Sequence, residues 1–154
     1  MAEVYSLVYR PRNEHPAEHY LRIPSESVQL RVGQGIEGDR NGGKNPERQL
    51  NVMTYETMDV LAQEGFKARP GELGEQIVVR GLDVNNLAAG TQVQLGESAV
   101  IEIVKPRTGC DRFESIQGKP RGDAANRLGM MAKVVVGGEV RIGDAVKMLE
   151  AVSQ

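Results

Sequence analysis

The sequence predicts a mainly β fold: a closed or nearly closed barrel with one clear α-helix and a few short helical turns. Short runs of Val, Ile and Leu alternate with polar residues, a pattern typical of strands. The 18 glycines and 7 prolines supply turns between these runs. Strands do not alternate regularly with helices, which disfavours a doubly wound parallel sheet, and barrel closure removes exposed strand edges.

The first half of the chain predicts three strands, at residues 4–10, 27–32 and 48–53. The second of them alternates most cleanly, with Val28, Leu30 and Val32 on one face. A glycine-rich loop separates the second strand from the third.

The clear helix is predicted over residues 55–64. Thr54 is its expected N-cap, and Gly65 ends it. Its apolar residues recur at helical spacing and form one stripe, which predicts packing against the core: Tyr55, Met58, Leu61 and Ala62.

The second half predicts further strands, giving eight or nine in all, with short helical turns near residues 111–116 and 123–128. These later strands are expected at residues 75–82, 91–97, 99–105, 130–136, 139–143 and 145–149.

Length and composition favour one soluble domain over residues 1–154. A single cysteine excludes an internal disulfide, which favours a reducing compartment, and we expect the cytoplasm. The N-terminus lacks the pattern of a signal peptide, and no apolar run approaches the roughly 18 residues of a membrane span. With 19 basic and 21 acidic residues, no Trp and two Phe, neither a nucleic-acid nor a membrane partner is expected.

The segment GQGIEG (residues 33–38) matches the G-x-G-x-x-G pattern of dinucleotide-binding folds. That pattern requires a following helix, and Gly42, Gly43 and Pro46 make a helix unfavourable here. The loop can still present backbone N–H groups to an anion, with Arg40 and Arg48 beside it.

Two pairs of polar residues are weaker candidates. His15 and His19 have the spacing of a metal pair on a helix, but two surface histidines is the better interpretation. Glu72 and Glu75 could form a general acid/base pair, but a glycine turn that enters a strand is favoured.

Cys110 lies in the loop KPRTGCDRF and is the main candidate for chemistry. A lone cysteine is usually a small buried residue. The alternative is a reactive thiol, because Lys105, Arg107 and Arg112 can favour the thiolate, although Asp111 opposes this. Such a thiol can accept a sulfur atom, ligate a soft metal or sense oxidants.

Several segments, taken in order, together resemble a MOSC domain, the molybdenum cofactor sulfurase C-terminal domain. The resemblance covers residues 25–149 and is carried by GIEGDR (35–40), RQLNVM (48–53), PGELGEQIVVRGLDVNNLAAGTQVQLGESAVIEIVKPRTGCDRF (70–113) and GMMAKVVVGGEVRIGDAV (129–146).

The resemblance implies a MOSC-type β-barrel and a role for Cys110. This residue matches the family's characteristic cysteine, which carries sulfur as a persulfide or ligates molybdenum. The remaining implied positions would suit the phosphate of a pterin, the molybdenum cofactor (molybdopterin): Asp39, Arg40, Arg48, Lys105, Arg107 and Arg112. The chain departs from the family pattern at Gln76, where the family commonly has Asn.

Three functions follow as alternatives. In the first, Cys110 accepts sulfur from a cysteine desulfurase, or another donor, and delivers it to a metal–sulfur centre. In the second, Cys110 ligates molybdenum during reduction of N-hydroxylated compounds. In the third, Cys110 is buried in a non-catalytic binding module. Pyridoxal phosphate enters only as a family-level association, and we expect a monomer or homodimer.

Overall fold

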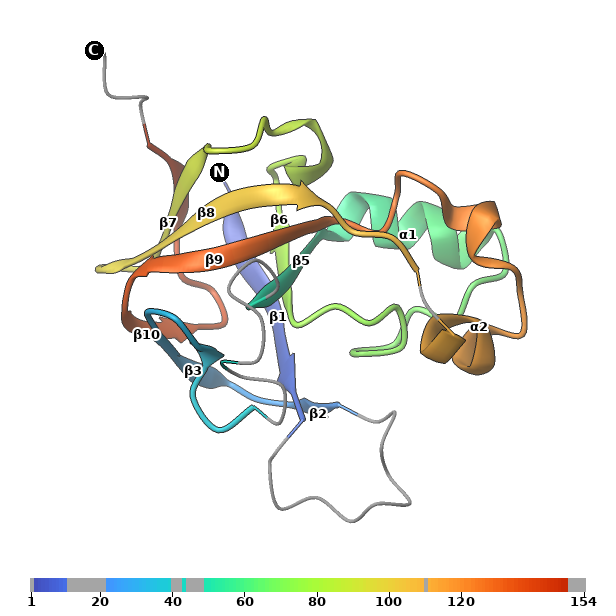
Figure 1. The fold of residues 1–154 in the computed structure, drawn as a ribbon, viewed down its shortest axis with the longest axis horizontal. Helices are drawn as coiled ribbons and strands as arrows, with labels where there is room; N and C mark the ends of the chain where they lie inside the picture. Colours follow the sequence, from blue (N-terminus) through green and yellow to red (C-terminus); the bar gives the residue numbers. More distant parts are fainter. Residues whose placement is uncertain (1, 11–21, 40–42, 44–48, 110, 150–154) are drawn as a thin grey trace.

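The computed structural model describes residues 2–10, 22–39, 43, 49–109 and 111–149. Eight strands form one curled sheet in the order β11-β7-β8-β9-β5-β6-β1-β2, with helices α1 and α2 beside it (Figure 1). In chain order these strands are β1 (Glu3–Tyr9), β2 (Ile23–Pro24), β5 (Leu50–Thr54), β6 (Ile77–Arg80), β7 (Gln92–Leu95), β8 (Ala99–Pro106), β9 (Met130–Val136) and β11 (Val146–Met148).

Backbone hydrogen bonds join β1 to the segment that leads into β11. The amide of Val4 donates to the carbonyl of Asp144 over 2.8 Å, and the amide of Gly143 donates to the carbonyl of Val4 over 2.8 Å. The amide of Val146 donates to the carbonyl of Ala2 over 3.1 Å. These bonds join β1, near one end of the strand order, to the segment before β11 at the other end. They leave fewer backbone groups unpaired at this edge of the sheet.

A second sheet of three strands packs against the first. Its strands are β3 (Ser27–Arg31), β4 (Gly35–Ile36) and β10 (Gly138–Arg141), in the order β10-β3-β4. Val28 and Leu30 are buried, which confirms the predicted alternation. Val32 was expected on the same face but is 65% exposed, because β3 ends at Arg31 and the chain turns.

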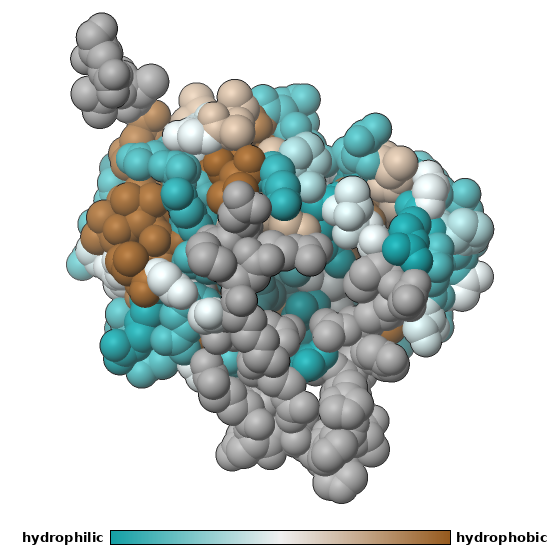
Figure 2. Space-filling view, in the orientation of Figure 1, coloured by the Kyte–Doolittle hydropathy of each residue, from teal (hydrophilic) through white to brown (hydrophobic). Residues whose placement is uncertain are grey.

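The interior of the curled sheet is filled by aliphatic side chains from both sheets, including Leu7, Leu30, Leu50 and Ile101, each 1% exposed or less. Each fully buried side chain of this kind contributes roughly 1.5–3 kcal/mol. Figure 2 shows that much of the described surface on one face is hydrophilic, with apolar side chains gathered toward the side that carries the start of β8 and the end of β9.

Helix α1 (Tyr55–Gln63) lies in the crossover between β5 and β6, which pair in parallel. Met58 and Leu61 are buried as predicted, while Ala62 is exposed. Thr54 occupies the N-cap position but does not cap the helix. Its hydroxyl instead donates to the carbonyl of Leu82 and accepts the amide of Val84.

Two smaller departures from the predicted elements concern short segments. The described chain has eleven named strands rather than eight or nine, because β2 and β4 are two-residue strands with no readable periodicity. Helix α2 (Asp111–Gln117) confirms the expected turn near 111–116. The second turn lies earlier than predicted, at the 3₁₀ helix η3 (Arg121–Ala124), since Pro120 starts it and Asn126 adopts a positive φ of 66°. A further 3₁₀ helix, η2, spans Val84–Asn86.

A second apolar cluster packs between the sheet and the helices. It contains Met58 and Leu61 of α1, Val78 of β6, Phe113 of α2, and Leu73 from the loop before β6. This cluster fixes α2 against the rest of the fold through Phe113.

Candidate functional site

The structure describes the side chains of three predicted site residues, Asp39, Lys105 and Arg107. The other predicted positions lie outside the described residues or have undescribed side chains: Arg40, Arg48, Cys110 and Arg112. The histidine pair, His15 and His19, also lies outside the described residues. The described part of the candidate site therefore consists of the residues just before and after Cys110 in the sequence, together with the residues that contact them.

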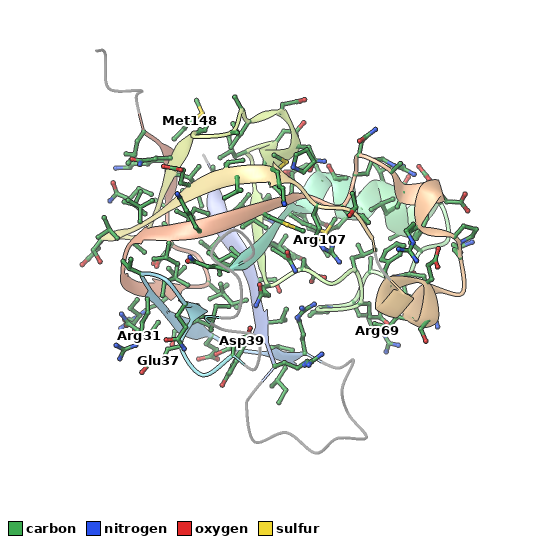
Figure 3. The ribbon with its side chains drawn as sticks, viewed as in Figure 1. Arg31, Glu37, Asp39, Arg69, Arg107 and Met148 are labelled. Atoms are coloured by element: carbon green, nitrogen blue, oxygen red, sulfur yellow. The ribbon has the colours of Figure 1, made fainter. Side chains whose placement is uncertain are left out.

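Asp39 ties the end of β1 to the start of β6. It is 3% exposed, and its Oδ1 accepts the backbone N–H of Arg10 over 3.0 Å. Its Oδ2 accepts Nε2 of Gln76 over 3.3 Å. Both carboxylate oxygens of Asp39 thus hold buried protein groups, as a buried charge requires. Figure 3 shows Asp39 toward the β3 side of the molecule.

Gln76, the position that departs from the family pattern, is the other half of this connection. It is 4% exposed, and its Oε1 accepts the backbone N–H of Asn51 over 2.9 Å. Asn51 in turn donates from Nδ2 to the carbonyl of Gly74 over 3.2 Å. Asn51 was missed by sequence reasoning because nothing in its local pattern distinguishes it from a strand residue.

Glu75 is buried inside the turn that precedes β6. It is fully buried; its Oε2 accepts the N–H of Gly71 over 2.8 Å, and its Oε1 accepts that of Leu73 over 3.2 Å. Burial raises the pKa of Glu75, against the opposing effects of the hydrogen bond from Gly71, of the backbone N–H of Glu75 itself, and of Arg22 and Arg107. Glu72 instead accepts the amide of Arg69, so the two carboxylates have separate partners, in agreement with the favoured glycine-turn interpretation.

Arg107 is buried rather than displayed on the surface. It is 7% exposed, and its Nη1 donates to the carbonyls of Leu73 over 2.7 Å and Leu128 over 3.4 Å. A Cβ on Gly74, which has a φ of +84°, would lie 2.9 Å from Cζ of Arg107. The glycine therefore makes room for the guanidinium.

Gln117 makes the matching connection on the other side of Cys110. This side chain of α2 is 6% exposed; its Oε1 accepts the N–H of Lys67 over 2.6 Å. Its Nε2 donates to the carbonyls of Lys67 over 2.8 Å and Glu72 over 3.0 Å. Residues 67–76, which we call the anchor segment, thus bind both Arg107 and Gln117. Gln117 was missed because a lone Gln in a short helix carries no sequence signal.

Positive charge also lies next to the cysteine position. Lys105 is exposed at the end of β8. Arg121 of η3 donates from Nη1 to the carbonyl of Gly109 over 3.3 Å, and from Nη2 to Glu114 over 3.0 Å. A Cβ on Gly109 would lie 2.9 Å from Cβ of Arg121, so this glycine allows η3 to pack closely. Arg121 was not among the predicted site residues.

The charge here is compatible with an anionic group: Arg121 is a partly exposed cation bonded to Gly109 and also paired with Glu114, and Lys105 is an exposed cation four residues before Gly109 in the sequence. In the described part of the chain, no three His, Cys, Asp or Glu side chains gather as a metal site. No helix among the described residues has the length and apolar character needed to cross a membrane.

Comparison with known proteins identifies the domain type. The family model of the MOSC domain matches residues 38–147. No curated protein matches the sequence. Among solved structures, the chain is similar to the YuaD protein from Bacillus subtilis, with a TM-score of 0.76, 18% identity, and coverage of 95% of this chain and 94% of that one.

Two further structures share the fold. YiiM from Geobacillus stearothermophilus has a TM-score of 0.76 at 14% identity, covering 97% of this chain and 76% of that one. YiiM from Escherichia coli has a TM-score of 0.71 at 21% identity, covering 100% and 72% respectively. At these identities the likeness concerns the fold.

Proposed function

Because this chain belongs to the MOSC domain family, we propose that it is a sulfur carrier in which Cys110 accepts a sulfane sulfur as a persulfide. The thiolate of Cys110 attacks the outer sulfur of a persulfide on a cysteine desulfurase. The S–S bond of the donor breaks, a new S–S bond forms on Cys110, and the donor cysteine leaves as a thiolate. No net oxidation or reduction accompanies this transfer.

The observation that carries the proposal is that the chain is anchored on both sides of Cys110. Before it, Arg107 binds the carbonyl of Leu73; after it, Gln117 binds Lys67 and Glu72. Both partners belong to the anchor segment. A nucleophile whose flanking residues are fixed loses less entropy when it reacts, which suits repeated transfer of one atom.

The basic residues divide into two roles in this proposal. Arg121, bonded to Gly109, and Lys105, at the end of β8, stabilise the anionic sulfur electrostatically. Arg107 is a positioning residue, since its Nη1 is directed to backbone carbonyls. Arg40, Arg48 and Arg112 are proposed, from the sequence, to contribute to the same anion site.

The acceptor is proposed to be a metal–sulfur centre, in the first instance molybdenum. The family is associated with molybdenum cofactor binding. If the cofactor binds here, Lys105 and Arg121 would contact its phosphate, and Asp39 would hold the end of β1 and the residue before β6 through Arg10 and Gln76. The bound cofactor would supply redox and atom-transfer chemistry.

Intact-protein mass spectrometry tests the proposal. Wild type and Cys110→Ser are incubated with a cysteine desulfurase and cysteine. We expect a gain of about 32 Da that is lost on reduction, in wild type alone. Because the sequence holds one cysteine, the position of any adduct is unambiguous.

The two other outcomes contradict the sulfur-carrier proposal in different ways. If Cys110 alkylates readily but gains no sulfur, metal ligation is favoured. Metal analysis of protein from a cofactor-producing host then checks that alternative. No adduct and no alkylation in the native state would assign Cys110 to the core of a non-catalytic module.

A further inference from the structure

A hollow of about 390 Å³ lies between β1 and α1, and no residue of 105–109 is among its described lining residues. The anchor segment forms its third side, through Ala68, Pro70 and Glu75. This volume lies within the range of small-molecule sites, which is about 300–1,000 Å³. Nothing in the sulfur-carrier proposal uses this hollow.

The inner surface of the hollow is apolar and aromatic. Leu7, Met58 and Val78 line it and are each 7% exposed or less. Tyr5 of β1 and Tyr55 of α1 stand together in its lining, with ring centroids 4.4 Å apart. Tyr5 remains 41% exposed, so a large aromatic side chain is left open to a ligand.

The polar groups of the lining favour a cation. They are the carboxyl groups of Asp59 and Glu75 and the hydroxyls of Tyr5, Ser6 and Tyr55, and no lysine or arginine is among the described lining residues. Glu75 already accepts two backbone N–H groups, whereas exposed Asp59 accepts one bond, from Gln63 over 3.1 Å. An ionised carboxylate can accept further bonds, so Asp59 is the group available to a ligand.

Arginines around the hollow do not offset this preference. The Arg80 guanidinium lies 5.5 Å from the centroid of the Tyr5 ring, but it is paired with the carboxylate of Glu3. Its charge is therefore largely balanced outside the hollow. Arg22 and Arg107 act electrostatically on buried Glu75, which leaves Asp59 as the exposed negative group of the lining.

We propose that the hollow binds a small organic cation. Its apolar or aromatic body would lie against Met58, Val78 and the two tyrosines, and its ammonium group would pair with Asp59. The aromatic faces add an attraction that a neutral ligand of the same shape lacks. This site is separate from the proposed sulfur chemistry and does not depend on it.

Three probes of similar shape and different charge test the proposal: benzylamine, benzyl alcohol and benzoate. The readout is the ¹³C-methyl resonance of Met58, assigned with a Met58→Leu variant. We expect saturable shifts, with benzylamine binding roughly threefold or more tightly than benzyl alcohol, and benzoate weakest. Equal binding of the three probes, or no saturable shift with benzylamine, would overturn the proposal.

Variants of two lining residues locate the site. Ala62→Leu fills the hollow from a helix position where Leu is well tolerated, so benzylamine binding should be lost. Asp59→Asn should remove the preference for benzylamine over benzyl alcohol, whereas Asp123→Asn, an exposed control in η3, should keep it. Unchanged binding in both lining variants would place the probe elsewhere and overturn the assignment.

Cys110→Ser separates this inference from the sulfur-carrier proposal. We expect this variant to bind benzylamine with unchanged affinity, although it cannot carry sulfur. A tenfold loss of benzylamine affinity in this variant would contradict a separate site.

Discussion

The Nη1 of Arg107 donates to the carbonyl oxygen of Leu73 across 2.7 Å. Arg107 follows β8 and Leu73 precedes β6, so this bond connects two strands that are not neighbours in the sheet. It fixes the chain three residues before Cys110 to the anchor segment. We therefore expect that disturbing this bond affects both stability and the reactivity of the thiol.

Gly74→Ala is the sharpest disturbance. The added Cβ would collide with the Arg107 guanidinium, and the backbone φ of +84° disfavours any side chain. We expect a loss of about 2–4 kcal/mol in the free energy of unfolding, measured by denaturant titration, together with slower sulfur loading of Cys110.

Gly90→Ala is the matched control for that change. Gly90 has a similar φ of +91°, but no atom lies within 4 Å of the place that an added Cβ would take. The free energy of unfolding of this variant should therefore fall only by the conformational cost of the side chain, about 1–2 kcal/mol, and Cys110 should load sulfur normally. Equal effects of the two substitutions would show that the Arg107 contact is unimportant.

The second anchor is tested at Gln117. Gln117→Met keeps the size of this buried side chain but removes its three hydrogen bonds to Lys67 and Glu72. Unpaired backbone groups should cost about 2–4 kcal/mol, and amide hydrogen exchange at Lys67 should accelerate. Gln63→Met, at an exposed position of α1, is the control. Unchanged protection of Lys67 would refute the anchor.

A double-mutant cycle tests the Asp39–Gln76 hydrogen bond. The single variants Asp39→Ala and Gln76→Ala should each destabilise the fold, because each leaves buried backbone N–H groups unpaired. Their effects should be non-additive by about 0.5–3 kcal/mol. Additive effects in denaturant titrations would mean that the two side chains act independently.

Glu75 should make stability depend on pH. Burial raises its pKa above 4.5, so the folded chain holds this proton to higher pH than the unfolded chain does. The stability from this difference is fully present below about pH 4.5 and is lost as pH rises through the folded pKa. Relative to Glu75→Gln, wild type should therefore become less stable from about pH 4.5 toward neutral.

Glu114 provides a control in which stability should change with pH in the opposite direction. The hydrogen bond from Arg121 lowers the pKa of Glu114, so its contribution is present above the unfolded value and is lost as pH falls. Relative to Glu114→Gln, wild type should lose stability on acidification. Parallel pH profiles for wild type and Glu75→Gln would contradict the buried-carboxyl prediction.

Much of the fold could be predicted from local pattern. Strict alternation identified β3, and helical spacing with Gly65 identified α1. The two-residue strands β2 and β4 could not be predicted, because pairing with another strand, not the local pattern of two residues, creates them. Thr54 has the right residue type for a cap, but tertiary partners take its hydroxyl.

The candidate site was less predictable for the same reason. Basic charge near the cysteine could be read from the sequence, but Arg107 is buried against carbonyls that lie 34 and 21 residues away. Gln117 and Asn51 act through partners far along the chain, and an amide side chain carries no local sign of such a role.

The most direct test of the proposed role of Cys110 compares its alkylation by iodoacetamide in folded and denaturant-unfolded wild type at neutral pH. A thiolate favoured by Lys105 and Arg121, between flanks held by Arg107 and Gln117, should react at least as fast in the folded chain as in the unfolded one. A thiol that stays protected until the chain unfolds would contradict the sulfur-carrier role and make Cys110 a core residue.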